Sequence, residues 1–324
     1  MVTIEQIEAD PIFRALNPTG KEFMQERQLS SRLNRFHKLG LPVHALIPFG
    51  LFPHIKSIAT VGMMMLDYSE GRYKDKHTLV VDSSGNTAHA VCRLAPAFGF
   101  KHVKVVMSTD VPNSKREILA ALSWVEIIQI PTGVAKRARE EGQKPGCYHL
   151  DQYKHWGNLM AHCDFTGPEI RRVLGEHIGI IAVAMGSSGT AAGVGRYFKT
   201  TVPVGRAPLI IGVRPVLGEQ VPGTRDEDRM KEVVTLPWEQ YVDDVVEVSR
   251  KESFIAMRRL WGEVEPMPGP SSGLAYAGLL KYLDEHFDAN PWFAGRKAAF
   301  ICPDDGRFYT ERTTGELDPD QGIL

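Results

Sequence analysis

The sequence predicts an α/β fold of two domains, each with a mostly parallel sheet covered by helices. Short apolar runs, such as residues 78–82 and 178–185, alternate with stretches of helical character. Strands that are apolar on both faces are typical of parallel sheets buried between helices. The length of 324 residues exceeds what one hydrophobic core usually organises, which favours two domains.

The predicted elements follow one another in order along the chain. Strands are expected at residues 78–82, 102–107, 125–130, 178–185, 208–213, 245–248 and 298–302. Helices are expected at residues 57–66, 87–98, 114–122, 166–174, 190–198, 251–260 and 272–283. Residues 131–146 are rich in Gly, Lys and Glu and are interpreted as a surface connection, and the charged run 225–229 as a solvated turn.

Composition and charge exclude several classes of protein. Hydrophobic residues make up 43% of the chain and charged residues 24%, which is ordinary for a globular protein. The 38 basic and 39 acidic residues give a net charge of −1, so neither nucleic acid nor a membrane is expected as the partner. No apolar stretch is long enough to cross a bilayer.

The cysteines and the first residues predict a cytoplasmic protein. The four cysteines lie far apart, at positions 92, 147, 163 and 302, and none forms a CxxC pair, which argues against a disulfide scaffold. Residues 1–11 are acidic and lack the apolar core of a signal peptide. No metal site is predicted, because the spacings of His149, His155 and His162 match no metal-binding helix.

Two loops of small residues each follow an apolar strand and open a helix. The first is Ser83-Ser84-Gly85-Asn86-Thr87 and the second is Gly186-Ser187-Ser188-Gly189-Thr190. A helix N-terminus presents free backbone N–H groups and the positive end of the helix dipole, so each loop is a candidate anion site. The alternative is a tight turn in which a serine side chain caps the helix. Neither loop has the GxxxxGK[ST] or GxGxxG pattern of a nucleotide site.

A series of further motifs accompanies these loops in a fixed order. In chain order they are Ser84-Gly85-Asn86-Thr87, Leu150-Asp151-Gln152-Tyr153, Thr166-Gly167-Pro168-Glu169-Ile170, Gly186-Ser187-Ser188-Gly189-Thr190, Pro222-Gly223-Thr224-Arg225 and Ser271-Ser272-Gly273. Over residues 45–312 the chain resembles the pyridoxal-phosphate (PLP) enzymes of fold type II, the tryptophan synthase β-like fold. Within that family it is similar to cysteine synthase and to cystathionine β-synthase, whose C-terminal segment resembles Pro303-Asp304 with Arg307 and Tyr309.

The resemblance implies a lysine that carries the cofactor, and two lysines are candidates. Asn17-Pro18-Thr19-Gly20-Lys21 resembles the stretch that precedes the family's lysine, but Lys21 lies about twice the family interval before Asn86. Lys56 lies at the family interval and precedes an apolar helical stretch, where desolvation would lower the pKa of its amine and make it nucleophilic. We therefore predict that Lys56 binds PLP and acts as the general base.

The resemblance also implies roles for the other motif residues. Asn86 and Ser271 would contact the hydroxyl oxygen and the nitrogen of the cofactor ring, and for Ser271 the alternative is a cap of the helix that follows. The cofactor phosphate would lie in the second loop, against Gly186, Ser187, Ser188, Gly189 and Thr190. The substrate would be held by Ser83, Ser84, Thr87 and Gln152, with His54 beside it. Asp304 and Asp305 are expected to shape the rim of the pocket.

The chemistry implied is β-replacement on an activated L-serine through an α-aminoacrylate intermediate, with a small amino acid as substrate and a second small molecule as nucleophile. A hydroxyl opposite the pyridine nitrogen makes the ring a weaker electron sink than an Asp would. Two alternatives stay open: a PLP-dependent lyase, dehydratase or racemase of the same fold, and a catalytically silent PLP-binding regulator. Replacement and the lyase alternative separate on the product, because replacement gives a new β-substituted amino acid whereas elimination gives a keto acid and ammonia.

The segment before Lys56 departs from the family pattern. Phe52, Pro53 and His54 stand where the family has an Asn-Pro-x-Gly turn and a serine. An imidazole is larger than a hydroxyl and can be cationic near neutral pH, so we expect a different leaving group or a larger nucleophile than sulfide. The sequence names neither molecule.

We also predict where the two domains begin and end and how the protein assembles. A smaller, mobile domain is expected at residues 46–160, and a larger domain that binds the cofactor phosphate at residues 1–45 and 161–324, with the cofactor in the cleft between the two. The resemblance implies a homodimer.

Overall fold

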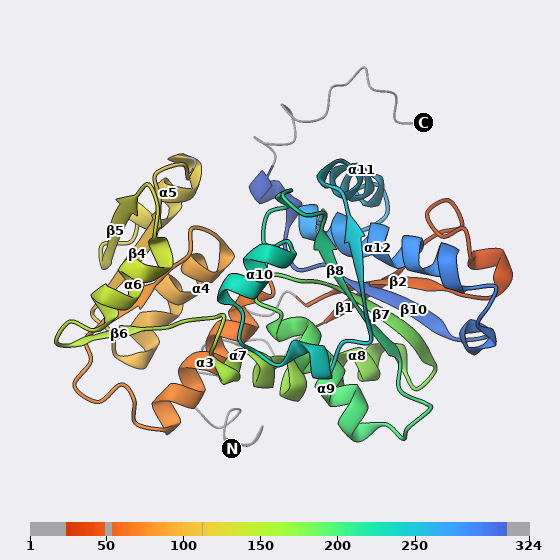
Figure 1. Ribbon diagram of the computed structural model, residues 1–324, viewed down its shortest axis with the longest axis horizontal. Coiled ribbons are helices and arrows are strands. Elements are labelled where there is room, and N and C mark those ends of the chain that lie inside the picture. Colours follow the sequence, from red (N-terminus) through yellow and green to blue (C-terminus); the bar gives the residue numbers. More distant parts are fainter. Residues whose placement is uncertain (1–23, 49–53, 112, 310–324) are drawn as a thin grey trace. The chain divides into compact units, whose positions relative to one another are not determined.

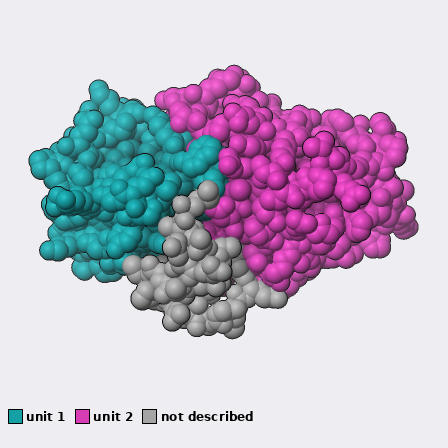
Figure 2. Space-filling model, turned by 90° about the horizontal axis from the view of Figure 1, so that it is seen from below, with its two compact units in different colours: residues 1–21, 56–161 teal, residues 22–55, 162–324 magenta. Residues whose placement is uncertain are grey.

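The computed structural model describes residues 24–48, 54–111 and 113–309 (Figure 1). The chain forms two compact units: Lys56–Ala161 belong to unit 1, and the described parts of Glu22–Ile55 and His162–Leu324 belong to unit 2 (Figure 2). Lys21, Phe52 and Pro53 lie outside the described residues. No helix in the described ranges is long and apolar enough to span a membrane.

Unit 1 contains a four-stranded sheet in the order β5-β4-β3-β6, in which every pair of neighbouring strands is parallel. Its strands are β3 (Thr78–Val81), β4 (His102–Ser108), β5 (Val125–Ile130) and β6 (Cys147–His149). Its helices are α3 (Lys56–Ser69), α4 (Asn86–Leu94), α5 (Asn113–Ala120), α6 (Val134–Gly142) and α7 (Trp156–Ala161), with a 3₁₀ turn at Ala95–Phe98. The predicted parallel pairing is therefore present.

Unit 2 contains a six-stranded sheet in the order β1-β2-β10-β7-β8-β9, parallel except for the β1–β2 pair. Its strands are β1 (Gln25–Gln28), β2 (Val43–Ile47), β7 (Ile178–Ala184), β8 (Leu209–Pro215), β9 (Asp244–Val248) and β10 (Lys297–Ile301). Its helices are α8 (Gly167–Leu174), α9 (Gly189–Thr201), α10 (Glu227–Val233), α11 (Arg250–Leu260) and α12 (Pro270–His286). A π-helical turn, His162–Thr166, precedes α8.

Helices cover both faces of the sheet in unit 2. Figure 1 shows α11 and α12 on one side of the strands and α8 and α9 on the other. The central strands are apolar on both faces, and residues of β7 and β10 such as Ile180 and Phe300 are fully buried. Because each buried aliphatic side chain contributes about 1.5–3 kcal/mol, this layering accounts for much of the stability of the unit.

Two predictions about the course of the chain are wrong. The predicted start of the smaller domain at residue 46 falls inside β2, which pairs with β10 in the larger sheet, so unit 1 begins later, at Lys56. Residues 131–146 are not a bare connection, because they contain α6, which packs against β4 and β6. The helix could not be recognised from the sequence because most of its residues are charged and its buried face is short, with Ala138 and Glu141.

Candidate active site

Lys56 is the first residue of α3, and the chain passes from unit 2 to unit 1 at this point. The preceding residue is held in unit 2, because the backbone N–H of Ile55 donates to the carbonyl oxygen of Pro303 at 2.7 Å. Helix α3 lies very close to α7: a Cβ atom on Gly62 would lie 2.4 Å from the Cβ of Ala161. This close approach fixes the helix that begins with Lys56.

The first loop brings two predicted substrate residues together in unit 1. The hydroxyl of Thr87 donates to Oε1 of Gln152 at 2.9 Å, and the two residues are 4% and 5% exposed. Gln152 is held in turn by Asn158, whose Nδ2 donates to its carbonyl oxygen at 2.7 Å. The serine-cap alternative is wrong for this loop, because Gly85 is the N-cap of α4 and no side chain caps the helix. Ser83, Ser84 and Asn86 are half-buried.

Two histidines of unit 1 pair with buried carboxylates around this loop. Nε2 of His149 lies 3.2 Å from Oδ1 of Asp82, which directly precedes Ser83. Nδ1 of His155 accepts from the backbone N–H of Gly157, so Nε2 carries the proton and donates to Asp67 of α3 at 2.8 Å. These pairs tie the segment around Gln152 to β3 and α3. In the described part of the chain, no cluster of three or more His, Cys, Asp and Glu residues is placed to hold a metal.

The second loop lies in unit 2, between β7 and α9. Gly186 is packed so closely that a Cβ atom would lie 2.4 Å from the carbonyl oxygen of Gly223. Ser188 has a left-handed backbone (φ +62°), is 3% exposed, and its Oγ has no hydrogen-bond partner among the described residues. Ser188 is the N-cap of α9, but its side chain does not cap the helix, so the serine-cap alternative is wrong here as well.

His162 belongs to this loop's surroundings, although sequence reasoning gave it no role there. Its Nε2 lies 3.1 Å from the hydroxyl of Thr190, and its Nδ1 lies 2.8 Å from the hydroxyl of Thr166. His162 is buried and starts the π-helical turn that packs against α9. π-Helical turns frequently occur at functional sites, but a single sequence carries no local signal for them. His162 therefore orients a hydroxyl of the predicted phosphate loop.

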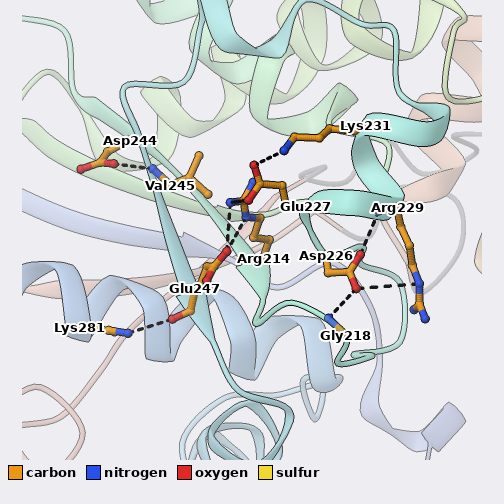
Figure 3. Close-up of polar contacts among 10 residues, drawn as sticks. All are labelled: Arg214, Gly218, Asp226, Glu227, Arg229, Lys231, Asp244, Val245, Glu247 and Lys281. Atoms are coloured by element: carbon orange, nitrogen blue, oxygen red, sulfur yellow. Dashed lines mark hydrogen bonds and ion pairs between the residues drawn. The ribbon is translucent and has the colours of Figure 1, made fainter.

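The segment that carries Gly223 is fixed by the N-terminus of α10 (Figure 3). Asp226 is buried, and its carboxylate accepts from the backbone N–H groups of Gly218 and Arg229, each at 3.0 Å. These hydrogen bonds, the one from Arg229 first, lower the pKa of Asp226. The predicted solvated turn at 225–229 is therefore wrong, since Asp226 caps α10 and closes residues 218–226 into a loop.

Arg214 holds the same helix to the sheet (Figure 3). From β8, its Nη2 lies 2.7 Å from Glu227 at the start of α10 and 3.0 Å from Glu247 on β9. Lys231 forms a second ion pair with Glu227 at 2.6 Å. The loop with Gly223 thus starts and ends on anchored elements.

Ser271 lies at the start of α12, close to this loop. A Cβ atom on Gly223 would lie 4.0 Å from its Oγ, so the turn at Gly223 is near both Gly186 and Ser271. The capping interpretation of Ser271 is wrong, because Gly269 is the N-cap and α12 begins at Pro270. The hydroxyl of Ser271 instead donates to Oδ1 of Asp304 at 3.4 Å.

His54 lies in unit 2, as does Ser271. It is 1% exposed, and its backbone forms an antiparallel bridge with Asp304. Asp304 is itself buried, rather than at an open rim, while Asp305 pairs with Arg307. The contact of His54 with the substrate stays a prediction.

The residues of unit 2 fit a phosphorylated cofactor. Gly186 leaves no room for a side chain where the backbone turns into α9, and the buried Oγ of Ser188 is a hydrogen-bonding group that a phosphate oxygen would satisfy. The N-terminus of the 13-residue helix α9 adds its N–H groups and dipole. Gly186, Ser187, Ser188, Gly189 and Thr190 would thus hold the phosphate of PLP, with Ser271 near its ring.

Similarity to known proteins agrees with this geometry. The sequence is 29% identical over 270 residues to cysteine synthase B of Pseudomonas aeruginosa, which covers 82% of this chain and 85% of that protein. It is 30% identical over 239 residues to cystathionine beta-synthase of Dictyostelium discoideum, covering 67% of this chain and 47% of that protein.

Solved structures agree with the predicted fold. The cysteine synthase of Entamoeba histolytica has a TM-score of 0.79 at 21% identity and covers 91% of this chain and 89% of that chain. An O-ureido-L-serine synthase has a TM-score of 0.78 at 19% identity, covering 92% and 94%. These likenesses confirm the α/β fold of fold type II.

The sequence model of one family matches more than half of the chain, from residue 55 to residue 290, under the description "Pyridoxal-phosphate dependent enzyme". This range contains Lys56, both loops and Ser271. PLP is therefore the cofactor, and the chain belongs to the family of pyridoxal-phosphate dependent enzymes that includes cysteine synthase and cystathionine β-synthase.

Proposed function

We propose that this enzyme catalyses β-replacement on an activated L-serine. The observation that carries the proposal is the buried pair of Thr87 and Gln152 at the N-terminus of α4. A buried hydroxyl and amide beside a helix N-terminus suit the α-carboxylate of an amino acid, because the helix dipole stabilises the anion by up to about 2 kcal/mol. Ser83 and Ser84 extend the same loop and would provide further hydrogen bonds.

Different residues of the chain would have different roles in this reaction. Bound PLP supplies an electron sink for the negative charge that develops at the substrate Cα. Lys56 is the amine proposed to hold the cofactor, to take the proton from Cα as general base and to return it at the end. The loop that contains Thr87 holds the carboxylate, which fixes the orientation of the Cα–H bond toward this base.

The identity of the leaving group and the nucleophile rests on weaker support. The relatives are named for cysteine, cystathionine and O-ureido-L-serine, which favours an O-substituted L-serine as donor and a small nucleophile as acceptor. His54 replaces a small residue of the family pattern, so we propose a donor or acceptor other than O-acetyl-L-serine with sulfide. The low exposure of His54 supports a fixed position for its ring.

The experiment is a product assay on the purified holoenzyme. Free, O-acetyl- and O-phospho-L-serine are each supplied with sulfide, a thiol amino acid or an amine, and the products are identified by mass spectrometry. A new β-substituted amino acid with one of these pairs supports the proposal, and a keto acid with ammonia in every case would show elimination instead. Lys56→Ala should abolish turnover, whereas the control Lys74→Ala, at an exposed lysine of the same unit, should not.

The choice of substrate is tested on the same enzyme with a variant at His54. Turnover of O-acetyl-L-serine with sulfide at a kcat/KM near about 10⁴ M⁻¹s⁻¹ or above, unchanged in His54→Ser, would contradict the specialised preference. We also propose that the protein is cytoplasmic. All four cysteines are free and buried, which supports a reducing compartment.

A further inference from the structure

Asp304 places a carboxylate directly behind Ser271. It follows β10, is 2% exposed, and accepts the hydroxyl proton of Ser271 at Oδ1. The hydroxyl of Tyr309 donates to Oδ2 through a short hydrogen bond, and the backbone N–H of Gly269 donates to its carbonyl oxygen at 3.0 Å. Asp304 is therefore oriented from several sides by residues of unit 2.

Both oxygens of this carboxylate accept hydrogen bonds, Oδ1 from Ser271 and Oδ2 from Tyr309. It lies at the N-terminus of α12, where a Cβ atom on the N-cap Gly269 would lie 2.2 Å from Oδ1. The dipole of this 17-residue helix stabilises a negative charge at that end. The neighbouring Cys302 is a neutral thiol, since burial, with the charge of Asp304 adding to it, raises its pKa to about 12. Asp304 is thus the hydrogen-bond acceptor next to Ser271.

The direction of the hydrogen bond decides what Ser271 offers to the cofactor ring. A serine hydroxyl has one proton to donate and two lone pairs with which to accept. When its proton points to Asp304, only lone pairs remain for a group on the other side of the oxygen. A neutral pyridine nitrogen also presents a lone pair, and two lone pairs repel each other. A protonated nitrogen, in contrast, donates to the oxygen.

We infer that Asp304 is a positioning residue, which acts through Ser271 to keep the pyridine nitrogen of the cofactor protonated. The inference rests on the proposed placement of Ser271 opposite that nitrogen. The proton comes from water, and neither Ser271 nor Asp304 loses one. The ring is then a stronger electron sink than the serine alone implies, so negative charge at the substrate Cα is stabilised more than the sequence predicted.

The test measures the protonation of the ring directly. The apo-protein is loaded with PLP that carries ¹⁵N in the ring, and the nitrogen resonance of the bound cofactor is recorded at one mildly alkaline pH. We expect the wild-type signal to be that of a protonated ring. In Asp304→Asn the pKa of the ring nitrogen should fall by about one unit or more, so the ratio of protonated to neutral ring falls about tenfold or more.

A second variant at Asp304 and a control variant at Asp305 show whether an effect is specific to Asp304. Asp304→Ser also removes the carboxylate and is smaller, so it serves if the asparagine variant does not fold. Asp305→Asn changes the adjacent buried carboxylate, which pairs with Arg307, and should leave the resonance unchanged. Affinity of the apo-variants for PLP, from fluorescence titration, shows that each one binds the cofactor.

Each outcome has a defined meaning. A neutral ring in the wild type overturns the inference. The inference also fails if Ser271→Ala shifts the nitrogen resonance but neither Asp304 variant does. In both cases the proposed function still stands. An equal shift in Asp305→Asn would show an unspecific effect and also overturn it. If Ser271→Ala leaves the nitrogen resonance unchanged, Ser271 does not contact the ring nitrogen, and the inference fails.

Discussion

The hydroxyl of Ser188 is buried and has no hydrogen-bond partner among the described residues. An unsatisfied buried hydroxyl costs about 1–3 kcal/mol, whereas a phosphate oxygen beside it would form a charged hydrogen bond. Ser188→Ala should therefore leave the apo-protein as stable or more stable and weaken PLP binding by about tenfold. Thermal unfolding of the apo-form and titration with PLP measure the two effects. A less stable apo-variant with unchanged PLP affinity would contradict the assignment.

Some residues of the candidate site could be identified from the sequence, and others could not. Thr87 and Gln152 were predicted as substrate residues through motifs, and the structure brings them within 2.9 Å. The contact between His162 and Thr190 could not be predicted, because it joins a π-helical turn to a loop 28 positions away. The pairing of Ser271 with Asp304 likewise spans 33 positions and depends on how β10 lies beside α12.

At the scale of the element, α10 depends on Asp226 for its N-terminus (Figure 3). Loss of a capping carboxylate costs about 1 kcal/mol, so Asp226→Ala should lower the free energy of unfolding by about that amount. The pKa of Asp226 is lowered in the folded state, so this contribution is present above the pKa of about 3.9 in the unfolded chain and is lost as the pH falls through the lower folded value. The difference between wild type and variant should vanish in acid.

Urea unfolding at neutral and acidic pH measures this difference. The exposed Asp228 lies in the same first turn of α10 but does not cap the helix, so Asp228→Ala is the control and should change stability little. Equal losses in the two variants at neutral pH would show that Asp226 does not act as a cap.

The strands that were predicted correctly share one property, which is a continuous run of apolar, often β-branched residues. β5 was predicted at its observed limits, and β4, β7 and β10 within a residue or two of theirs. β1 (QERQ) and β6 (CYH) were missed because an edge strand of polar residues and a strand of three residues carry no such run. β2 was missed although it is fully buried, since its histidine interrupts the apolar pattern.

At the scale of the whole molecule, the chain passes between its two units at Lys56 and again after Ala161. The two domains with mostly parallel sheets could be predicted from the alternation of apolar strands and helices. The residue at which the chain crosses between them could not, because it depends on which sheet β2 joins. We expect the protein to be a homodimer, a property that the family resemblance implies. Sedimentation at micromolar concentration should give a mass twice that of the chain, and a monomer would contradict this expectation.

Chemical labelling shows directly whether Lys56 holds the cofactor. Borohydride reduction of the yellow holoenzyme should fix PLP to a single lysine, which peptide mapping by mass spectrometry then identifies. We expect the label on Lys56, the first residue of α3, and its loss in Lys56→Ala. A label on Lys21, or on no lysine at all, would contradict it.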